Sequence, residues 1–173
     1  MVFMKIDLHN HSTASDGVLS PTALVQRAHE KGVKVLALTD HDTLAGIEQA
    51  RATAQELGLY LVNGIELSCL WNGMTIHVLG YDFCLNNQAL NEVITNLYNA
   101  REQRAEEIDR RLNKAGFADT LAGAKAVQQQ RGAVQTPPAR PHFAEYMVQA
   151  GYVKNHAEAF KKWLGAGKVG DVK

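Results

Sequence analysis

The ten residues VKVLALTDHD, from Val33 to Asp42, decide the fold of this chain. The first six are an almost unbroken apolar run, which is typical of a strand buried on both faces of a parallel sheet. Ligands of α/β proteins gather at the carboxyl ends of such strands, so Asp40 and His41 lie where a site is expected. Helix capping by Asp42 or Thr43 is the simpler explanation, but it accounts for only one residue of the cluster.

Helical segments flank this strand in the sequence. The preceding segment begins with Ser20–Pro21, a capping residue followed by a first-turn proline, and stops at Gly32. The following segment begins at Thr43, which we expect to cap it, and ends at Gly58. A buried strand between two helices predicts an α/β architecture.

Strand candidates lie on both sides of this unit. Residues 2–11, VFMKIDLHNH, form a short run with period-two features. Residues 59–71 and 74–83 are apolar runs separated by Asn72-Gly73, the strongest short signal of a hairpin. The expected order through residue 83 is β-α-β-α-β-β, with at least three strands able to pair in parallel.

The second half of the chain has a helical pattern and no convincing strand. Helices are expected at 87–114, about 121–130, about 142–149 and about 157–164, with a proline-containing loop before the third. We interpret this half as a helical insertion or appendage to the α/β part.

The composition limits the classes of function. Of the 173 residues 46% are apolar, and 18 basic residues balance 18 acidic ones. A zero net charge provides no general attraction for duplex DNA or an anionic membrane. No apolar run is long enough to span a bilayer, and no signal peptide is recognisable. The two cysteines, Cys69 and Cys84, lack CxxC spacing, which favours a reduced, cytoplasmic protein.

A histidine pair follows the first strand candidate, in KIDLHNHSTASDG, residues 5–17. If the strand continues toward residue 11, His9 and His11 share one face with Asp7, because side chains alternate along a strand. Such a pair can bind one metal ion, and Asp16 follows within reach. Taken alone, the two histidines are better explained as exposed or satisfied residues, and Asp16 as a turn-capping carboxylate.

The predicted hairpin supplies a third group of candidate ligands. A two-residue turn at 72–73 pairs Ser68 with His77, and Glu66 lies two residues from Ser68 on the same face. Glu66 and His77 are then diagonal neighbours, about 7–8 Å apart between Cα atoms, and can share an ion. Taken alone, His77 would be explained as a satisfied core histidine and Glu66 as an exposed glutamate.

The three groups together exceed the needs of one ion. Mixed imidazole and carboxylate ligands suit Mn²⁺, Fe²⁺ or Zn²⁺. We therefore expect two or three divalent ions, an arrangement typical of phosphoester hydrolysis, where one ion activates water and another polarises the phosphoryl oxygen. The candidate ligands are His9, His11, Asp16, Asp40, His41, Glu66 and His77.

Four motifs, DLHNHSTASDG, ALTDHD, GIE and IHVLG, resemble those of the PHP family (polymerase and histidinol phosphatase). The later stretch RPHFAEYMVQAGYVKNHAEAFKKWLGAGK resembles its small members that act on nucleoside 3′,5′-bisphosphates and the 5′ ends of short RNA. The resemblance implies a distorted (β/α)7 barrel, three metal ions at the carboxyl ends of its strands, and an inserted helical subdomain.

The resemblance also implies roles for individual residues. Arg140 and His142 would reach from the insertion toward the substrate phosphate or base, whereas a solvated loop cation and a residue at a helix N-terminus are the simpler explanations. Asp16, Asp40 and Glu66 would also be catalytic. On the metal ions, His9 and His11 would bind the first, Asp16 and His41 the second, and His77 the third, with Glu66 bridging and Asp40 in or beside the ligand set.

This sequence departs from the family pattern in one respect. The family has a His-Pro motif and an Asp-x-His motif further along, and neither occurs here after residue 142. A barrel of this class needs roughly 200 residues or more. We interpret residues 1–84 as the N-terminal part of an incomplete barrel, 85–165 as the helical insertion subdomain, and 166–173 as the start of the return to the barrel.

The leading hypothesis is a hydrolase, a metal-dependent phosphoesterase that uses a metal-activated water. Its substrates would be phosphate esters of small nucleotides, such as nucleoside 3′,5′-bisphosphates, and the 5′ ends of short single-stranded RNA, not duplex DNA. Manganese is the favoured metal, with iron or zinc as alternatives. The alternative hypotheses are a non-catalytic metal-binding PHP module or inactive fragment, and an amidohydrolase-type metal hydrolase, which also opens with HxH.

Overall fold

The computed structural model describes residues 4–132 and 136–172. The chain divides into two compact units, residues 1–95 and 96–173, and the division falls within the long helix α3 (Gln88–Lys114). No helix in the described ranges is both long and apolar enough to cross a membrane. The boundary predicted at residues 84 and 85 lies just before α3, and the assignment of the two parts to a barrel and an insertion stays a prediction.

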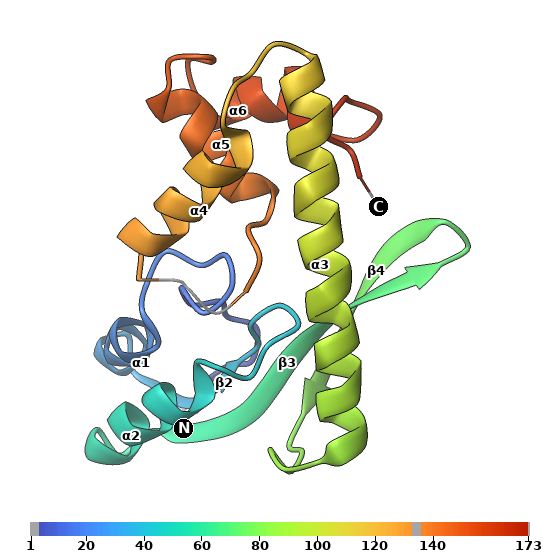
Figure 1. Cartoon of the computed structure of the whole chain (residues 1–173). Helices are drawn as coiled ribbons and strands as arrows, with labels where there is room; N and C mark the ends of the chain where they lie inside the picture. The colour runs from blue at the N-terminus through green and yellow to red at the C-terminus, as the bar shows by residue number, and fades with distance from the viewer. Residues whose placement is uncertain (1–3, 133–135, 173) are drawn as a thin grey trace. The chain divides into compact units, whose positions relative to one another are not determined.

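The first unit is built on a four-stranded sheet with the order β1-β2-β3-β4. The first three strands pair in parallel and β4 pairs antiparallel to β3, which confirms the expected order of strands and helices. Figure 1 shows β3 continuing into the hairpin. The strands are β1 (Lys5–Asp7), β2 (Val33–Leu38), β3 (Tyr60–Trp71) and β4 (Met74–Tyr81).

Two helices connect the parallel strands and supply the core of this unit. The first, α1 (Pro21–Glu30), is capped as predicted, because the Ser20 side chain accepts a hydrogen bond from the amide of Ala23. Apolar side chains of both helices pack with those of β2. The buried members of this cluster are Val25, Ala28, Val33, Leu36, Leu38, Ile47, Ala50, Ala54 and Leu59.

The second helix, α2 (Ile47–Glu56), begins later than expected, so the prediction that Thr43 caps it is wrong. Thr43 Oγ1 instead accepts a hydrogen bond from the amide of Ala45 in the preceding turn. The backbone of residues 40–42 remains paired with β3 beyond the end of β2, because the amide of Glu66 donates to the carbonyl of Asp40. A tight turn follows, in which the amide of Ile47 donates to the carbonyl of Leu44, and the helix begins only after this turn.

The first strand ends at Asp7, before the predicted end at residue 11, and residues 2 and 3 of the predicted strand lie outside the described residues. The following residues still run beside the end of β2, because Asn10 forms hydrogen bonds to Ala37 and Thr39 in place of regular strand pairing. Its amide donates to Thr39 Oγ1 at 3.1 Å, its carbonyl accepts from the Thr39 amide at 2.9 Å, and its side chain donates to the carbonyl of Ala37. The segment that carries the two histidines is therefore fixed without being a strand.

The hairpin has the predicted register. Ser68 pairs with His77, and the turn residues Asn72 and Gly73 have φ values of 47° and 74°. Positive φ at both central positions is the type I′ geometry that an Asn-Gly turn favours. Glu66 and His77 therefore lie on one face of the hairpin, as expected from the alternation of side chains.

Gly64 marks the closest approach of β3 to the end of β2. A Cβ at this position would lie 2.6 Å from the carbonyl oxygen of Leu38 and 2.7 Å from Thr39 Cγ2. We expect Gly64→Ala to lower the free energy of unfolding by about 1–3 kcal/mol, because backbone must move to admit the methyl group. Denaturant unfolding measures this. Gly80→Ala is the matched control, since its Cβ would come no nearer than 3.3 Å to Ile65; equal losses in the two variants would contradict the packing argument.

The second unit contains helices and, in its described residues, no strand, as predicted. After α3 come α4 (Thr120–Gln130), α5 (Arg140–Gln149) and α6 (His156–Ala159), and α6 continues into a π-helical turn at Phe160–Leu164. Their buried side chains form a separate core: Ala105, Ile108, Leu112, Ala124, Phe143, Ala144, Met147, Val153, Ala159 and Leu164.

Candidate metal centre

Six of the seven predicted metal ligands come together in the first unit, in three overlapping groups. In each group the potential ligand atoms lie within 4.8 Å of one another. The residues come from the segments that follow β1 and β2 and from the β3–β4 hairpin. The groups are His9 with His11 and Glu66, His11 with Asp16 and His41, and His41 with Glu66 and His77.

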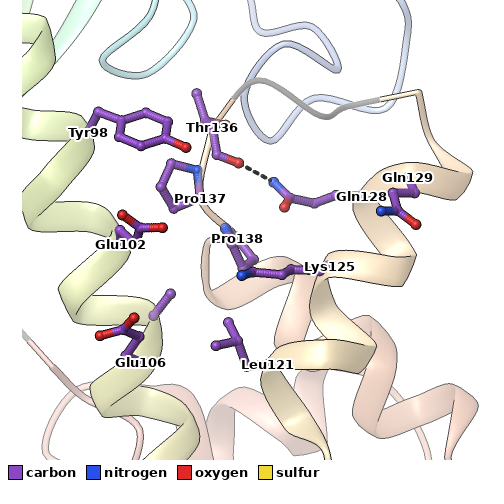
Figure 2. Close-up of a pocket in the computed structure, with 11 residues that line it drawn as sticks. Tyr98, Glu102, Glu106, Leu121, Lys125, Gln128, Gln129, Thr136, Pro137 and Pro138 are labelled. Atoms are coloured by element: carbon purple, nitrogen blue, oxygen red, sulfur yellow. Dashed lines mark hydrogen bonds between the residues drawn. The ribbon is translucent and has the colours of Figure 1, made fainter.

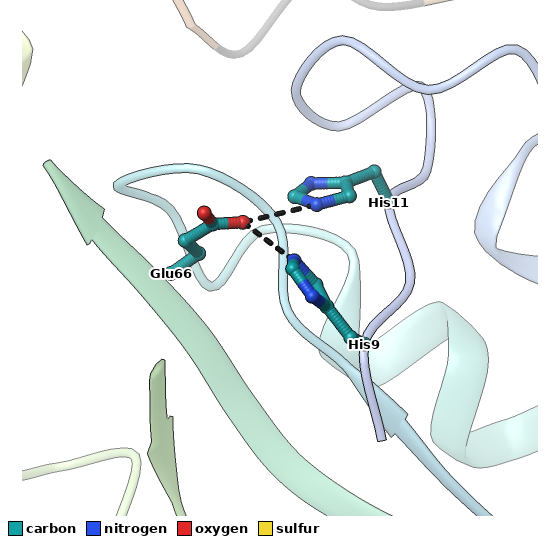
Figure 3. A group of neighbouring side chains, drawn as sticks. All are labelled: His9, His11 and Glu66. Atoms are coloured by element: carbon teal, nitrogen blue, oxygen red, sulfur yellow. Dashed lines mark hydrogen bonds and ion pairs between the residues drawn. The ribbon is translucent and has the colours of Figure 1, made fainter. Parts of the chain in front are cut away.

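Glu66 lies at the middle of this arrangement. Its Oε2 is 2.9 Å from His9 Nε2 and 3.0 Å from His11 Nε2, and Figure 3 shows both rings converging on this oxygen. The same oxygen lies 3.8 Å from His41 Nε2, and Oε1 lies 3.4 Å from His77 Nδ1. One buried carboxylate thus faces four imidazoles that three segments of the chain supply.

The four imidazole rings are also in contact with one another. The rings of His11 and His41 stack with their centroids 4.7 Å apart. The ring centroid of His9 lies 5.2 Å from that of His11, and the ring centroid of His77 lies 4.9 Å from that of His41. Imidazole is the commonest metal ligand among side chains, so a row of four rings is a suitable lining for a metal site.

The electrostatic surroundings keep Glu66 ionised. Burial raises the pKa of this carboxyl, but the hydrogen bond from His9 and the positive field of His41, His11 and His77 lower it further than burial raises it. The net pKa lies below its ordinary value, so Glu66 is a carboxylate at neutral pH. A carboxylate surrounded by imidazole nitrogens is a suitable setting for a divalent cation.

Backbone pairing brings the loop after β2 to the hairpin. His41 forms an isolated parallel bridge with Glu66, and the amide of Asp42 donates to the carbonyl of Glu66 at 3.0 Å. The Asp42 side chain then accepts a hydrogen bond from the amide of Ser68 at 2.7 Å. Sequence reasoning missed this contact, although a carboxylate directly after the Asp40-His41 pair was a signal for it.

A tight turn returns Asp16 to His11. The amide of Gly17 donates to the carbonyl of Ser12, and a Cβ on Gly17 would lie 2.3 Å from the carbonyl oxygen of His11. Only glycine therefore closes this turn. As a result Asp16 Oδ1 lies 3.7 Å from His11 Nδ1.

Asp40 is the predicted ligand that joins none of the three groups of described residues. It is 1% exposed, and Oδ1 accepts hydrogen bonds from the Ser12 amide at 2.7 Å and from Ser15 Oγ at 2.6 Å. Its Oδ2 accepts from Ser12 Oγ at 2.6 Å. Burial raises the pKa of Asp40, and the serine hydrogen bonds partly oppose that rise. These contacts hold the loop that carries His11, and the serines in HSTASDG were the sequence signal for them.

The two predicted substrate-binding residues lie in the second unit. Arg140 Nη1 donates to the carbonyl of Leu164 at 3.2 Å and lies 3.5 Å from Asp171 Oδ1. His142 is 1% exposed, and its Nδ1 accepts the amide of Ala139 at the start of α5. The role of both residues toward a substrate stays a prediction.

The site fits divalent metal ions on its own chemistry. Four imidazoles and two carboxylates are the ligand types that Mn²⁺, Fe²⁺ and Zn²⁺ accept. The Nδ1 atom of His11 is buried and has no hydrogen-bond partner in the described part of the chain. Because buried polar atoms are normally satisfied, a metal ion is a natural partner for this nitrogen.

Fold and site together define an α/β protein with a candidate metal centre beyond the ends of its parallel strands. Residues 7–168 match the family model of the PHP domain, and the chain belongs to this family.

Three curated relatives show how members of the family are named. The chain is 48% identical to a 5′-3′ exoribonuclease of Haemophilus influenzae, covering 98% of this chain and 60% of the relative. It is 42% identical to the 5′-3′ exoribonuclease Rnm of Escherichia coli, over 96% of this chain and 56% of the relative. It is 36% identical to a 3′,5′-nucleoside bisphosphate phosphatase of Chromobacterium violaceum, over 96% of this chain and 57% of the relative. The chain thus spans somewhat over half the length of these relatives.

Solved structures have the same fold over nearly the whole chain. An amidohydrolase from Chromobacterium violaceum with bound sulfate superposes with a TM-score of 0.87 at 35% identity, covering 98% of this chain and 58% of that one. A protein from Bifidobacterium adolescentis gives a TM-score of 0.88 at 29% identity with the same coverage.

Proposed function

We propose that this protein is a metal-dependent phosphoesterase that hydrolyses phosphate esters of small nucleotides. The observation that carries the proposal is the convergence of four histidines on the buried carboxylate of Glu66. Bound divalent ions would supply Lewis acidity toward phosphoryl oxygens and would activate water as the nucleophile. We propose two or three ions, with manganese favoured over iron and zinc.

Side chains of the candidate metal centre would hold and orient these ions. His9 and His11 would hold one ion, Asp16 and His41 a second, and His77 a third. Glu66, kept ionised by the surrounding histidines, would be shared between ions and would offset their positive charge. Asp16 is only partly buried, so it is the accessible carboxylate of the set and a candidate for contact with the reacting groups.

The proposed substrates are nucleoside 3′,5′-bisphosphates and the 5′ ends of short single-stranded RNA. Both present a phosphate ester on a nucleoside, and the names of the curated relatives cover both classes. The balanced charge of the chain supports a short substrate held by local groups, because tight binding of a long duplex needs a basic surface.

The test is manganese-dependent release of phosphate from adenosine 3′,5′-bisphosphate. It should be run on the 173-residue chain and on a form extended to the length of the relatives, because the chain spans somewhat over half of that length. Phosphate release by either form would support the proposal. Metal binding without phosphate release in either form would sink the proposed substrate and favour a non-catalytic metal-binding module. Hydrolysis of a separate amide substrate, without phosphate release from the bisphosphate, would favour the amidohydrolase alternative.

Arg140 provides a prediction for the substrate side of the proposal. We expect Arg140→Ala to raise KM for the bisphosphate about tenfold and to leave metal content unchanged, because an arginine contact to phosphate contributes to binding. Steady-state kinetics and metal analysis of the extended form measure both. Arg131→Ala, which removes an arginine paired with Glu145 in the same unit, is the control. An unchanged KM in Arg140→Ala would show that Arg140 does not contact the substrate and has only a structural role, through its hydrogen bond to the carbonyl of Leu164.

A further inference from the structure

The second unit contains a cavity of about 140 Å³ between α3 and α4. This is many times the volume that one buried water occupies, so the cavity has room for an organic group. Figure 2 shows Tyr98, Glu102 and Glu106 extending from α3 and Lys125 and Gln128 extending from α4 toward the same space. None of these residues belongs to the metal centre.

The floor of the cavity is buried and has one fixed polar group. Thr136, Pro137 and Pro138 are buried there, and Gln128 is 4% exposed. Gln128 Nε2 donates to the carbonyl of Thr136 at 3.0 Å, and this sets the orientation of the amide, because a carbonyl can only accept. Its Oε1 has no hydrogen bond within the described ranges and is left as an acceptor for a ligand.

The mouth of the cavity adds further acceptors and an aromatic ring. Tyr98, Glu102 and Glu106 follow one another at intervals of four residues, so they line one side of α3. Neither carboxylate has an ion pair or hydrogen bond to another described residue. Lys125 is the charged donor on the opposite wall. The cavity therefore offers more acceptors than donors, beside a flat aromatic surface.

We propose that this cavity binds a nucleobase with an N–H donor edge, guanine in particular. The Watson–Crick edge of guanine presents two adjacent N–H groups, which a carboxylate such as Glu102 or Glu106 accepts as a pair. Its O6 and N7 are acceptors that suit Lys125. Stacking on an aromatic ring and hydrogen bonding to the base edge is the common way in which proteins read single-stranded RNA.

This inference deepens the proposed function, because it assigns a base preference to an enzyme of nucleotides and short RNA. It is nevertheless testable separately, because all the described residues that line the cavity belong to the second unit and none of them is a candidate metal ligand. A nucleoside without phosphate probes the cavity alone. Guanosine in buffer with a chelator therefore reports on the base site whether or not the protein releases phosphate.

The experiment is calorimetric titration of the chain with guanosine and adenosine in the presence of EDTA. We expect guanosine to bind more tightly than adenosine, which lacks the two-donor edge. Glu102→Gln and Glu106→Gln should each weaken guanosine binding, the more affected one by about tenfold, and Tyr98→Ala should weaken it by about tenfold. Glu92→Gln, the same change on α3 outside the cavity, and His9→Ala in the metal centre should leave it unchanged.

Three results would overturn the proposal. The first is no heat of binding with guanosine at millimolar concentration. The second is equal binding of guanosine and adenosine that neither glutamine variant alters. The third is binding of spermidine, weakened by the glutamine variants, without binding of guanosine, which would make the cavity a site for organic cations. Loss of phosphate release with guanosine binding intact would instead count against the proposed function alone.

Discussion

Glu66→Gln is expected to lower manganese binding by more than about a hundredfold and to abolish phosphate release in the extended form. The change keeps the shape of the side chain and removes its charge, so the four surrounding imidazoles lose their common anionic partner. It also places an amide N–H₂ near histidine nitrogens, where a metal ligand needs a lone pair. Loss of hydrogen-bonding partners around metal ligands already costs about ten- to a hundredfold, and loss of a shared ligand should cost more.

The measurement is metal content after dialysis against a defined free manganese concentration, together with initial rates on adenosine 3′,5′-bisphosphate. Glu56→Gln is the matched control, because Glu56 is an exposed glutamate at the end of α2 outside the three ligand groups. Its metal content and rate should equal those of the unmodified protein. Wild-type manganese content in Glu66→Gln would remove Glu66 from the ligand set and with it the central argument for the site.

The hairpin shows why part of the site could be predicted from the sequence. A two-residue Asn-Gly turn fixes the register of its strands, and the side-chain period of two then fixes which residues share a face. These local rules were enough to place Glu66 beside His77, and the structure puts His77 Nδ1 3.4 Å from the carboxylate. The prediction depended on no contact distant in sequence.

The histidine pair was placed for a reason that the structure does not bear out. The argument needed a strand reaching residue 11, but β1 ends at Asp7. His9 and His11 still approach the same carboxylate oxygen, because Asn10 between them is tied to Thr39 by backbone and side-chain hydrogen bonds. Such a bond joins residues 29 apart and follows no local period, so sequence pattern alone could not reveal it.

The same limit explains the late start of α2. Thr43 has the residue type and the position of an N-cap, and local propensity favours a helix from there. The amide of Ile47 instead donates to the carbonyl of Leu44, and this tight turn takes the place of a first helical turn. Propensity is a weak prior, and it did not reveal that a turn comes between the paired residues 40–42 and the helix.

Asp40→Ala is expected to destabilise the fold and weaken metal binding together. The change leaves the amide of Ser12 and the hydroxyls of Ser12 and Ser15 without their acceptor. Leaving buried donors unsatisfied should lower the free energy of unfolding by about 2–4 kcal/mol. The loop that these bonds hold carries His11 and Asp16, so manganese affinity should fall about ten- to a hundredfold, as is typical when the support of a metal ligand is lost.

Asp40→Asn separates a positioning role from a direct metal contact. The amide oxygen can keep the bonds from the Ser12 amide and from Ser15 Oγ, and the N–H₂ can donate to Ser12 Oγ, so the loop should stay nearly in place. We therefore expect this variant to retain most of the stability and manganese affinity that Asp40→Ala loses, as measured by denaturant unfolding and metal content. Loss of manganese in Asp40→Asn at unchanged stability would show instead that the carboxylate binds metal directly. Asp40 would then have to turn away from the serines when ions bind.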